Sequence, residues 1–127
     1  MSKEVSARCT WSPNDGYRAE TPFGVIPMFD GDGHRAVELM LLSAVSCLNF
    51  FLVEYAKTRN YEINVIECSC DKEIVQRPER IGTINIYVNI DGNVNTDDKD
   101  KMVEICERSC KVMNTIKNTP ICNLVIQ

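Results

Sequence analysis

One long apolar stretch, residues 36–59, limits what this chain can fold into. It reads AVELMLLSAVSCLNFFLVEYAKTR and contains neither Gly nor Pro. Its apolar residues do not alternate with polar ones, so it predicts one long helix rather than a strand. The main stripe at helical spacing comprises Val37, Met40, Leu41, Ala44, Cys47, Leu48, Phe51 and Tyr55, and the opposite side carries Leu42, Val45 and Leu52. Because a small domain leaves a large share of its surface exposed, one chain would not cover this helix. We therefore expect a homodimer that buries it.

The same stretch makes a poor membrane span. Residues 37–53 are too few for a clean span and include Glu38 and Asn49. The N-terminal sequence MSKEVSARCTW has no apolar run after its positive charge, so we expect no secretory signal, and neither end resembles a lipidation site. We expect a cytoplasmic protein without a membrane partner.

Length and charge exclude several classes of protein. The chain has 127 residues, which predicts a single domain over residues 1–127. Its apolar fraction of 44% and charged fraction of 25% are those of a globular protein rather than a disordered one. The net charge is -4 and the basic residues are scattered, so a nucleic-acid partner is not expected.

The remaining segments predict strands and helices around the central helix. Strands are expected at residues 4–11, 17–21, 25–29, 61–74, 81–90 and 121–126, a second helix begins near Thr96, and a short helix covers residues 112–116. Residues 81–90 alternate most clearly, and in residues 61–74 we expect Ile63 and Val65 to face opposite to Ile66 and Cys68. This order predicts an α+β fold with hairpin-connected, largely antiparallel sheet.

The seven cysteines pose the chemical question. Seven is an odd number in a chain for which we expect no export signal, which argues against a disulfide framework. Cys47 lies in the apolar helix, where burial alone raises the pKa of a thiol and makes it inert. A reactive Cys47 therefore requires a nearby cation, and without one it is a packing residue.

A metal site is the weaker interpretation of the other thiols. Cys68 and Cys70 share one face of a predicted strand, and Cys106 and Cys110 lie one turn apart on a predicted helix. Four thiolates are a suitable set for a soft metal, but this spacing is not that of zinc ribbons, and the single histidine, His34, is remote. We expect neither a metal nor another cofactor.

Two cysteine-containing segments carry a resemblance. Residues 38–47, ELMLLSAVSC, and residues 110–116, CKVMNTI, resemble the two cysteine motifs of the OsmC/Ohr family of osmotically induced and organic hydroperoxide resistance proteins. The expected order of strands and helices agrees with that family over essentially the whole chain. The resemblance implies antiparallel sheets wrapped around long central helices in an intertwined homodimer, in the order βββ-α-ββ-α-β.

The resemblance also implies a thiol peroxidase. Cys47 falls on the position of the peroxidatic cysteine and Cys110 on that of the resolving cysteine. The implied substrates are organic hydroperoxides, alkyl or lipid, and the implied reductant is an external dithiol. The Cys47 sulfenic acid would condense with Cys110 to give a disulfide.

Two positions depart from the family pattern, and the arginine has two candidates. In the best-characterised branch, a glutamate ten residues before the first cysteine pairs with an activating arginine, and this position is Val37 here. Glu38 is rotated by about 100° from it and lies about 14 Å along the helix axis from Cys47, so only the Glu38 of a partner subunit would reach that thiol. Arg18 is the best match for the arginine by order along the chain, and Arg35 is the alternative. Lys111 replaces the proline that usually follows the second cysteine.

The departure at Val37 favours a second hypothesis. A dimeric OsmC-like protein that binds an apolar small molecule would keep the fold without efficient peroxidase activity. Consumption of an organic hydroperoxide distinguishes the two hypotheses.

Overall fold

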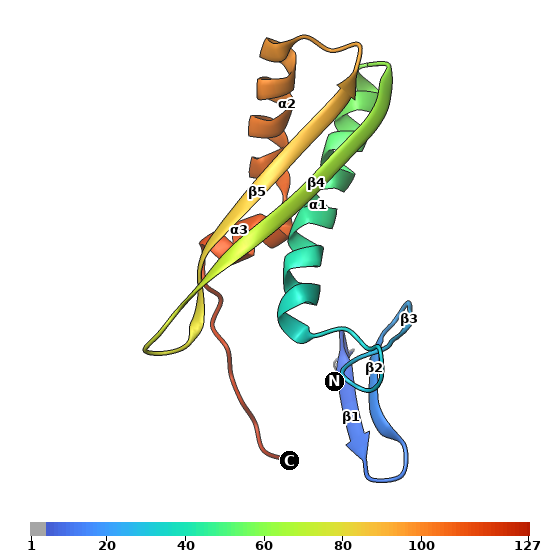
Figure 1. Cartoon of the computed structure of the whole chain (residues 1–127), viewed down its shortest axis with the longest axis vertical. Helices are drawn as coiled ribbons and strands as arrows, with labels where there is room; N and C mark the ends of the chain where they lie inside the picture. The colour runs from blue at the N-terminus through green and yellow to red at the C-terminus, as the bar shows by residue number, and fades with distance from the viewer. Residues whose placement is uncertain (1–4) are drawn as a thin grey trace, which may run out of the picture. The chain divides into compact units, whose positions relative to one another are not determined.

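The computed structural model describes residues 5–127 and has antiparallel sheets and helices, which confirms the α+β class. The chain forms two compact units, residues 1–40 and 41–127. Each unit has a sheet of its own (Figure 1). The predicted central helix is present as α1, Ala36–Thr58, which begins in the first unit and continues through the second.

The first unit contains the three predicted strands. They are β1 (Arg8–Ser12), β2 (Gly16–Thr21) and β3 (Gly24–Ile26), paired antiparallel in that order. Residue 4 of the first predicted strand lies outside the described residues. Gly16 has a φ of 69°, and a Cβ there would meet the Asp30 carboxylate, which accepts a hydrogen bond from the Tyr17 N–H at 2.8 Å. A glycine at position 16 is thus required by both the backbone conformation and the space.

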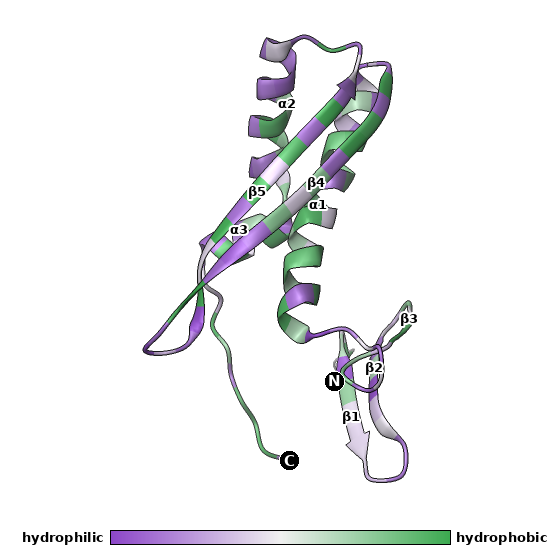
Figure 2. Cartoon of the chain, in the orientation of Figure 1, coloured by the Kyte–Doolittle hydropathy of each residue, from purple (hydrophilic) through white to green (hydrophobic). Residues whose placement is uncertain are grey.

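The second unit packs a long hairpin against two helices. The hairpin consists of β4 (Ile63–Val75) and β5 (Arg80–Gly92), followed by α2 (Thr96–Ser109) and α3 (Lys111–Lys117). In Figure 1 the hairpin crosses α1 and α2. The apolar cluster beneath it is buried around Leu48, Leu52, Ala56, Met102 and Cys106, with Ile86, Val88 and Ile90 of β5 against it. Apolar and polar residues alternate along β5, as predicted (Figure 2).

The predicted faces of β4 hold for Val65, Ile66 and Cys68 but were wrong for Ile63, which packs against the same apolar cluster as Ile66. The pairing register shifts between Ile63 and Val65, which indicates a β-bulge. A shift of one residue exchanges the two faces of a strand. Val65 is therefore exposed, whereas Ile66 and Cys68 face the core.

The second helix begins at Thr96, where the sequence predicts it. The Asn95 side-chain oxygen accepts a hydrogen bond from the Asp98 N–H at 2.8 Å, so Asn95 is the N-cap and Thr96 the first helical residue. Asp97 and Asp98 lie in the first turn, where the helix dipole favours negative charge.

The C-terminal segment differs from the prediction. Residues 121–126 pair with neither sheet of the single chain and form no strand. The segment is apolar yet exposed: Ile121, Leu124 and Ile126 are 88%, 99% and 100% exposed. A strand requires an edge to pair with, and this segment lies on the edge of neither described sheet.

One face of α1 stays apolar and open to solvent. Leu42 and Phe50 are 53% and 60% exposed, while Ala44, Leu48 and Leu52 on the other face are buried. By length and composition alone, α1 is long and apolar enough to cross a membrane. Core helices of soluble proteins meet the same two criteria. In this chain the hairpin and α2 cover its inner face.

Candidate active site

The fold brings together the two cysteines that the sequence singles out. Cys47 lies in α1, and Cys110 lies between α2 and α3, yet both belong to one apolar cluster with Ala44 and Met113. A hydrogen bond joins the two thiols. Cys110 is fully buried and Cys47 is only partly buried, so solvent reaches Cys47 first.

The backbone at Cys110 explains how its thiol is placed. Cys110 ends α2, where its N–H donates to the Glu107 carbonyl at 3.3 Å, and it also caps the start of α3. Its Sγ accepts a hydrogen bond from the Met113 N–H at 3.5 Å. The extended conformation at Cys110, φ -76° and ψ 110°, breaks the helix between α2 and α3 and turns the thiol toward α1. Lys111, in place of the family's proline, is the first residue of α3.

The protonation of Cys110 depends on Cys47. Burial raises the pKa of the Cys110 thiol, and its hydrogen bond to Cys47 and the charge of Cys47 raise that pKa further. The N–H groups of Met113 and Val112 act in the opposite direction by stabilising a thiolate. The Cys110 thiol is therefore harder to ionise than a free thiol.

The remaining thiols do not gather into a metal site. Within residues 5–127, no group of three or more His, Cys, Asp or Glu side chains is close enough to hold a metal ion. Burial raises the pKa of Cys68 and of Cys106, and a hydrogen bond from Asn49 lowers that of Cys68. Asn49 also donates to the Ile66 carbonyl at 2.9 Å, which ties α1 to β4.

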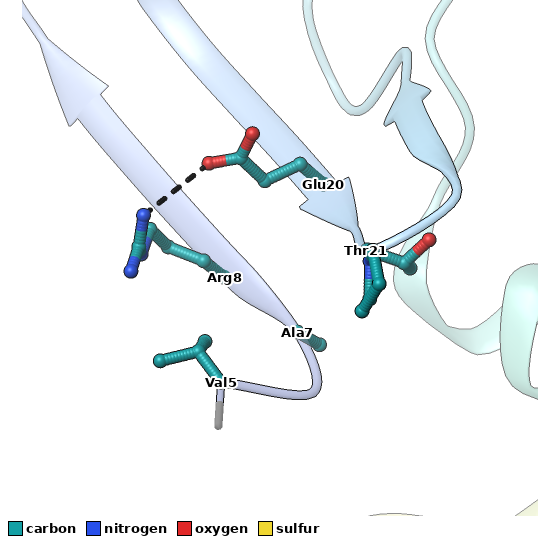
Figure 3. Close-up of a pocket in the computed structure, with 6 residues that line it drawn as sticks. Val5, Ala7, Arg8, Glu20 and Thr21 are labelled. Atoms are coloured by element: carbon teal, nitrogen blue, oxygen red, sulfur yellow. Dashed lines mark ion pairs between the residues drawn. The ribbon is translucent and has the colours of Figure 1, made fainter. Parts of the chain in front are cut away.

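The predicted activating arginine has an acidic partner in the first unit. Arg18 Nη2 lies 3.5 Å from Glu20 Oε2, and Arg8 Nη1 lies 3.6 Å from Glu20 Oε1. Arg8 and Glu20 border a pocket of about 420 Å³ in that unit, and their ion pair is drawn in Figure 3. The Arg18 side chain is 63% exposed, so the pair itself contributes little to stability.

The other predicted residues lie at the start of α1. Arg35, Val37 and Glu38 are all exposed, and Glu38 is in the first turn of the helix. They belong to the first unit, whereas the cysteine pair belongs to the second. The roles predicted for Arg18, Arg35 and Glu38 beside Cys47 therefore remain predictions.

Two residues of interest were missed at the sequence level. Glu20 lies two positions after Arg18 on the same strand, a spacing that places both side chains on one face and that signals the pair. Met113 contacts the cysteine pair, and its N–H donates a hydrogen bond to Cys110 Sγ, the N-cap of α3. Nothing in the sequence distinguishes Met113 from an ordinary core methionine.

The sequence matches a known protein family over most of its length. The model of the OsmC-like protein family matches residues 29–125, a range that includes both cysteines. The chain belongs to this family. A comparison with curated protein sequences gives no significant match.

Solved structures of OsmC-like proteins have the same fold. An OsmC-like protein from Mycoplasma pneumoniae matches with a TM-score of 0.77 and 14% identity over 94% of this chain and 91% of that one. The organic hydroperoxide resistance protein OsmC of Legionella pneumophila matches at 0.68 and 15% identity over 88% of each chain. The organic hydroperoxide resistance protein OhrB of Bacillus subtilis matches at 0.64 and 16%, over 91% of this chain and 93% of that one.

Proposed function

We propose that this OsmC-like protein is a thiol peroxidase that reduces alkyl or lipid hydroperoxides. The hydrogen-bonded pair of a partly exposed Cys47 and a buried Cys110 carries the proposal. Such a pair has one thiol for the peroxide and a second thiol to form a disulfide with it. The names of two structural relatives, organic hydroperoxide resistance proteins, support the choice of substrate.

The proposed reaction has three steps. The Cys47 thiolate attacks the distal peroxide oxygen, the O–O bond breaks, and the alkoxide takes a proton to leave as an alcohol. The resulting Cys47 sulfenic acid condenses with Cys110 to form a disulfide and water. An external dithiol then reduces the disulfide and restores both thiols.

The second step benefits from the electrostatics of the pair. Before oxidation, the charge of Cys47 helps to raise the pKa of Cys110. A sulfenic acid is neutral when protonated, so its formation removes that cause. The N–H groups of Met113 and Val112 still stabilise a Cys110 thiolate, while burial, the largest cause of its raised pKa, is unchanged.

The apolar surroundings of Cys47 favour organic substrates over hydrogen peroxide. Phe51, Ile86 and Ile116 pack against the cysteine cluster. Apolar side chains favour an alkyl group in this position. The proposal also requires a cation near the attacking sulfur.

Arg18 is the proposed cation, with Arg35 as the alternative. The family has a glutamate at the position of Val37. In this proposal Glu20, which pairs with Arg18, replaces that glutamate. Guanidinium stays charged when it is partly buried and offers forked donors to a peroxide oxygen. Glu38 would contribute only from a partner subunit.

A homodimer is part of the proposal. The open face of α1 borders a groove of about 540 Å³ lined by Leu42, Val45, Phe50 and Val53 among others. With the exposed apolar segment 121–126, this face leaves more apolar surface in water than is usual for a monomer. A second copy of the chain that packs on α1 would remove both apolar surfaces from water. We also expect a cytoplasmic location and no nucleic-acid or membrane partner.

We expect the purified protein to sediment as a dimer, at twice the chain mass of 14.4 kDa. Leu42→Glu combined with Phe50→Glu would place two charges in the groove and shift the protein to the monomer at micromolar concentration. Val65→Glu, at an exposed valine of β4, is the matched control and should remain dimeric. A wild-type mass of one chain would contradict the dimer.

The second candidate function is binding of an apolar small molecule without efficient turnover. Val37 in place of the family's glutamate is the observation that favours it. This hypothesis predicts that a hydroperoxide leaves Cys47 largely reduced.

We expect mild treatment with an organic hydroperoxide to produce mainly the Cys47–Cys110 disulfide. The two thiols are already hydrogen-bonded, and the other five cysteines are unpaired in this structure. Peptide mapping by mass spectrometry without reduction measures this directly. A main product linking Cys68 to Cys70, or Cys106 to Cys110, would count against the proposed pair.

A further inference from the structure

A further cavity lies within the second unit. It holds about 280 Å³, close to the lower end of ordinary ligand pockets. Residues of α1, β5, α2 and α3 line it, and it is partly open to solvent. Its apolar lining residues are Leu48, Ile84, Ile86, Val88, Val103 and Met113.

The chemistry of the walls restricts the ligand. Every apolar lining side chain is aliphatic or a thioether, so the cavity offers neither aromatic stacking nor hydrogen bonds along its walls. A polar group placed there would lose its hydrogen bonds to water. An unbranched aliphatic chain satisfies this restriction.

Among the described residues that line the cavity, the polar side chains are Glu107 and Lys117, which form an ion pair between α2 and α3. Both are substantially exposed, at 43% and 52%. A ligand carboxylate here would face the Glu107 carboxylate at close range. A hydroxyl group instead can donate to Glu107 and accept from Lys117, so both charges keep their partners.

We propose that this cavity is a binding site for a medium-length aliphatic alcohol, with the chain between β5 and α2 and the hydroxyl at the Glu107–Lys117 pair. The site is distinct from the cysteine pair, and the proposal does not depend on peroxidase activity. Met113 and Ile86 border both places, however. Because the Met113 N–H also bonds Cys110 Sγ, a bound chain contacts the residue that holds the buried thiol.

The test uses 1-octanol as the probe and the methyl groups of labelled methionine as the readout. In the NMR spectrum of protein labelled with [13C]methyl-methionine, Met113 should shift in a saturable manner as 1-octanol is added. Met40, an exposed methionine of the first unit, should shift little. A Met113 signal that does not move overturns the proposal.

Variants identify the cavity and the head group. Val103→Phe and Ile84→Phe each fill the cavity and should weaken binding by roughly tenfold or more, because the added ring takes the volume that the chain needs. Val65→Phe, outside the cavity, should bind like the wild type. Thermal unfolding verifies that each variant is folded. Equal binding by the folded filling variants overturns the site, and tighter binding of octanoate than of 1-octanol overturns the assigned head group.

Discussion

Cys47→Ser is expected to reduce hydroperoxide consumption to the uncatalysed rate. The assay follows loss of an organic hydroperoxide in the presence of a dithiol reductant. A serine hydroxyl keeps the size of the side chain but is neither ionised near neutral pH nor able to form the sulfenic acid. The change therefore removes the chemistry with little effect on packing.

Cys110→Ser separates the two half-reactions. In this variant the first equivalent of hydroperoxide should be consumed at close to the wild-type rate, since Cys47 is intact. The sulfenic acid then has no buried thiol to condense with and should accumulate, where a dimedone adduct at Cys47 detects it. Turnover should slow, because reduction then depends on direct attack by the external thiol.

Cys68→Ser is the matched control. Cys68 is partly buried like Cys47 and also accepts a side-chain hydrogen bond, but it lies on β4 and does not contact the cysteine pair. Its replacement should leave turnover nearly unchanged. If wild-type protein and Cys47→Ser consume hydroperoxide at the same rate, the binding-protein hypothesis replaces the peroxidase.

The sequence was sufficient for features that depend on local periodicity. The bounds of α1 and the faces of β5 follow from apolar spacing; the faces were predicted correctly and the bounds to within one residue. The face of Ile63 in β4 was not, because a bulge near Ile63 depends on how the partner strand pairs. Residues 121–126 have the pattern of a strand, but whether they form one depends on an available edge.

Some features of the candidate site could likewise be predicted from the sequence, and others could not. Spacing along the chain did not place Cys47 beside Cys110; the family resemblance did, and the break between α2 and α3 provides the physical reason. The Met113 cap could not be predicted, because it depends on the conformation of one residue at that break. The arginine partner, Glu20, was readable from strand spacing.

Arg18→Ala is expected to slow alkylation of Cys47 near pH 7 by roughly tenfold, since loss of a fixed cation near a thiol in apolar surroundings lowers its thiolate fraction by about that factor per pKa unit. Iodoacetamide labelling of Cys47, followed by peptide mass spectrometry across a pH series, measures the rate. At high pH the rates of variant and wild type should converge, because the thiol then ionises without help. A loss that persists at high pH would indicate altered access instead.

Arg8→Ala is the matched control for this prediction. Arg8 pairs with the same Glu20 carboxylate from the neighbouring strand, at 3.6 Å compared with 3.5 Å for Arg18, and its side chain is similarly exposed, 58% against 63%. Its loss perturbs the charge of the first unit as much as the loss of Arg18 does. If Cys47 is alkylated slowly in Arg18→Ala and at the normal rate in Arg8→Ala, the effect belongs to the position of the Arg18 guanidinium. Slow alkylation of Cys47 in Arg35→Ala would instead make Arg35 the activating cation. Normal alkylation rates in all three variants would indicate that Cys47 is a packing residue.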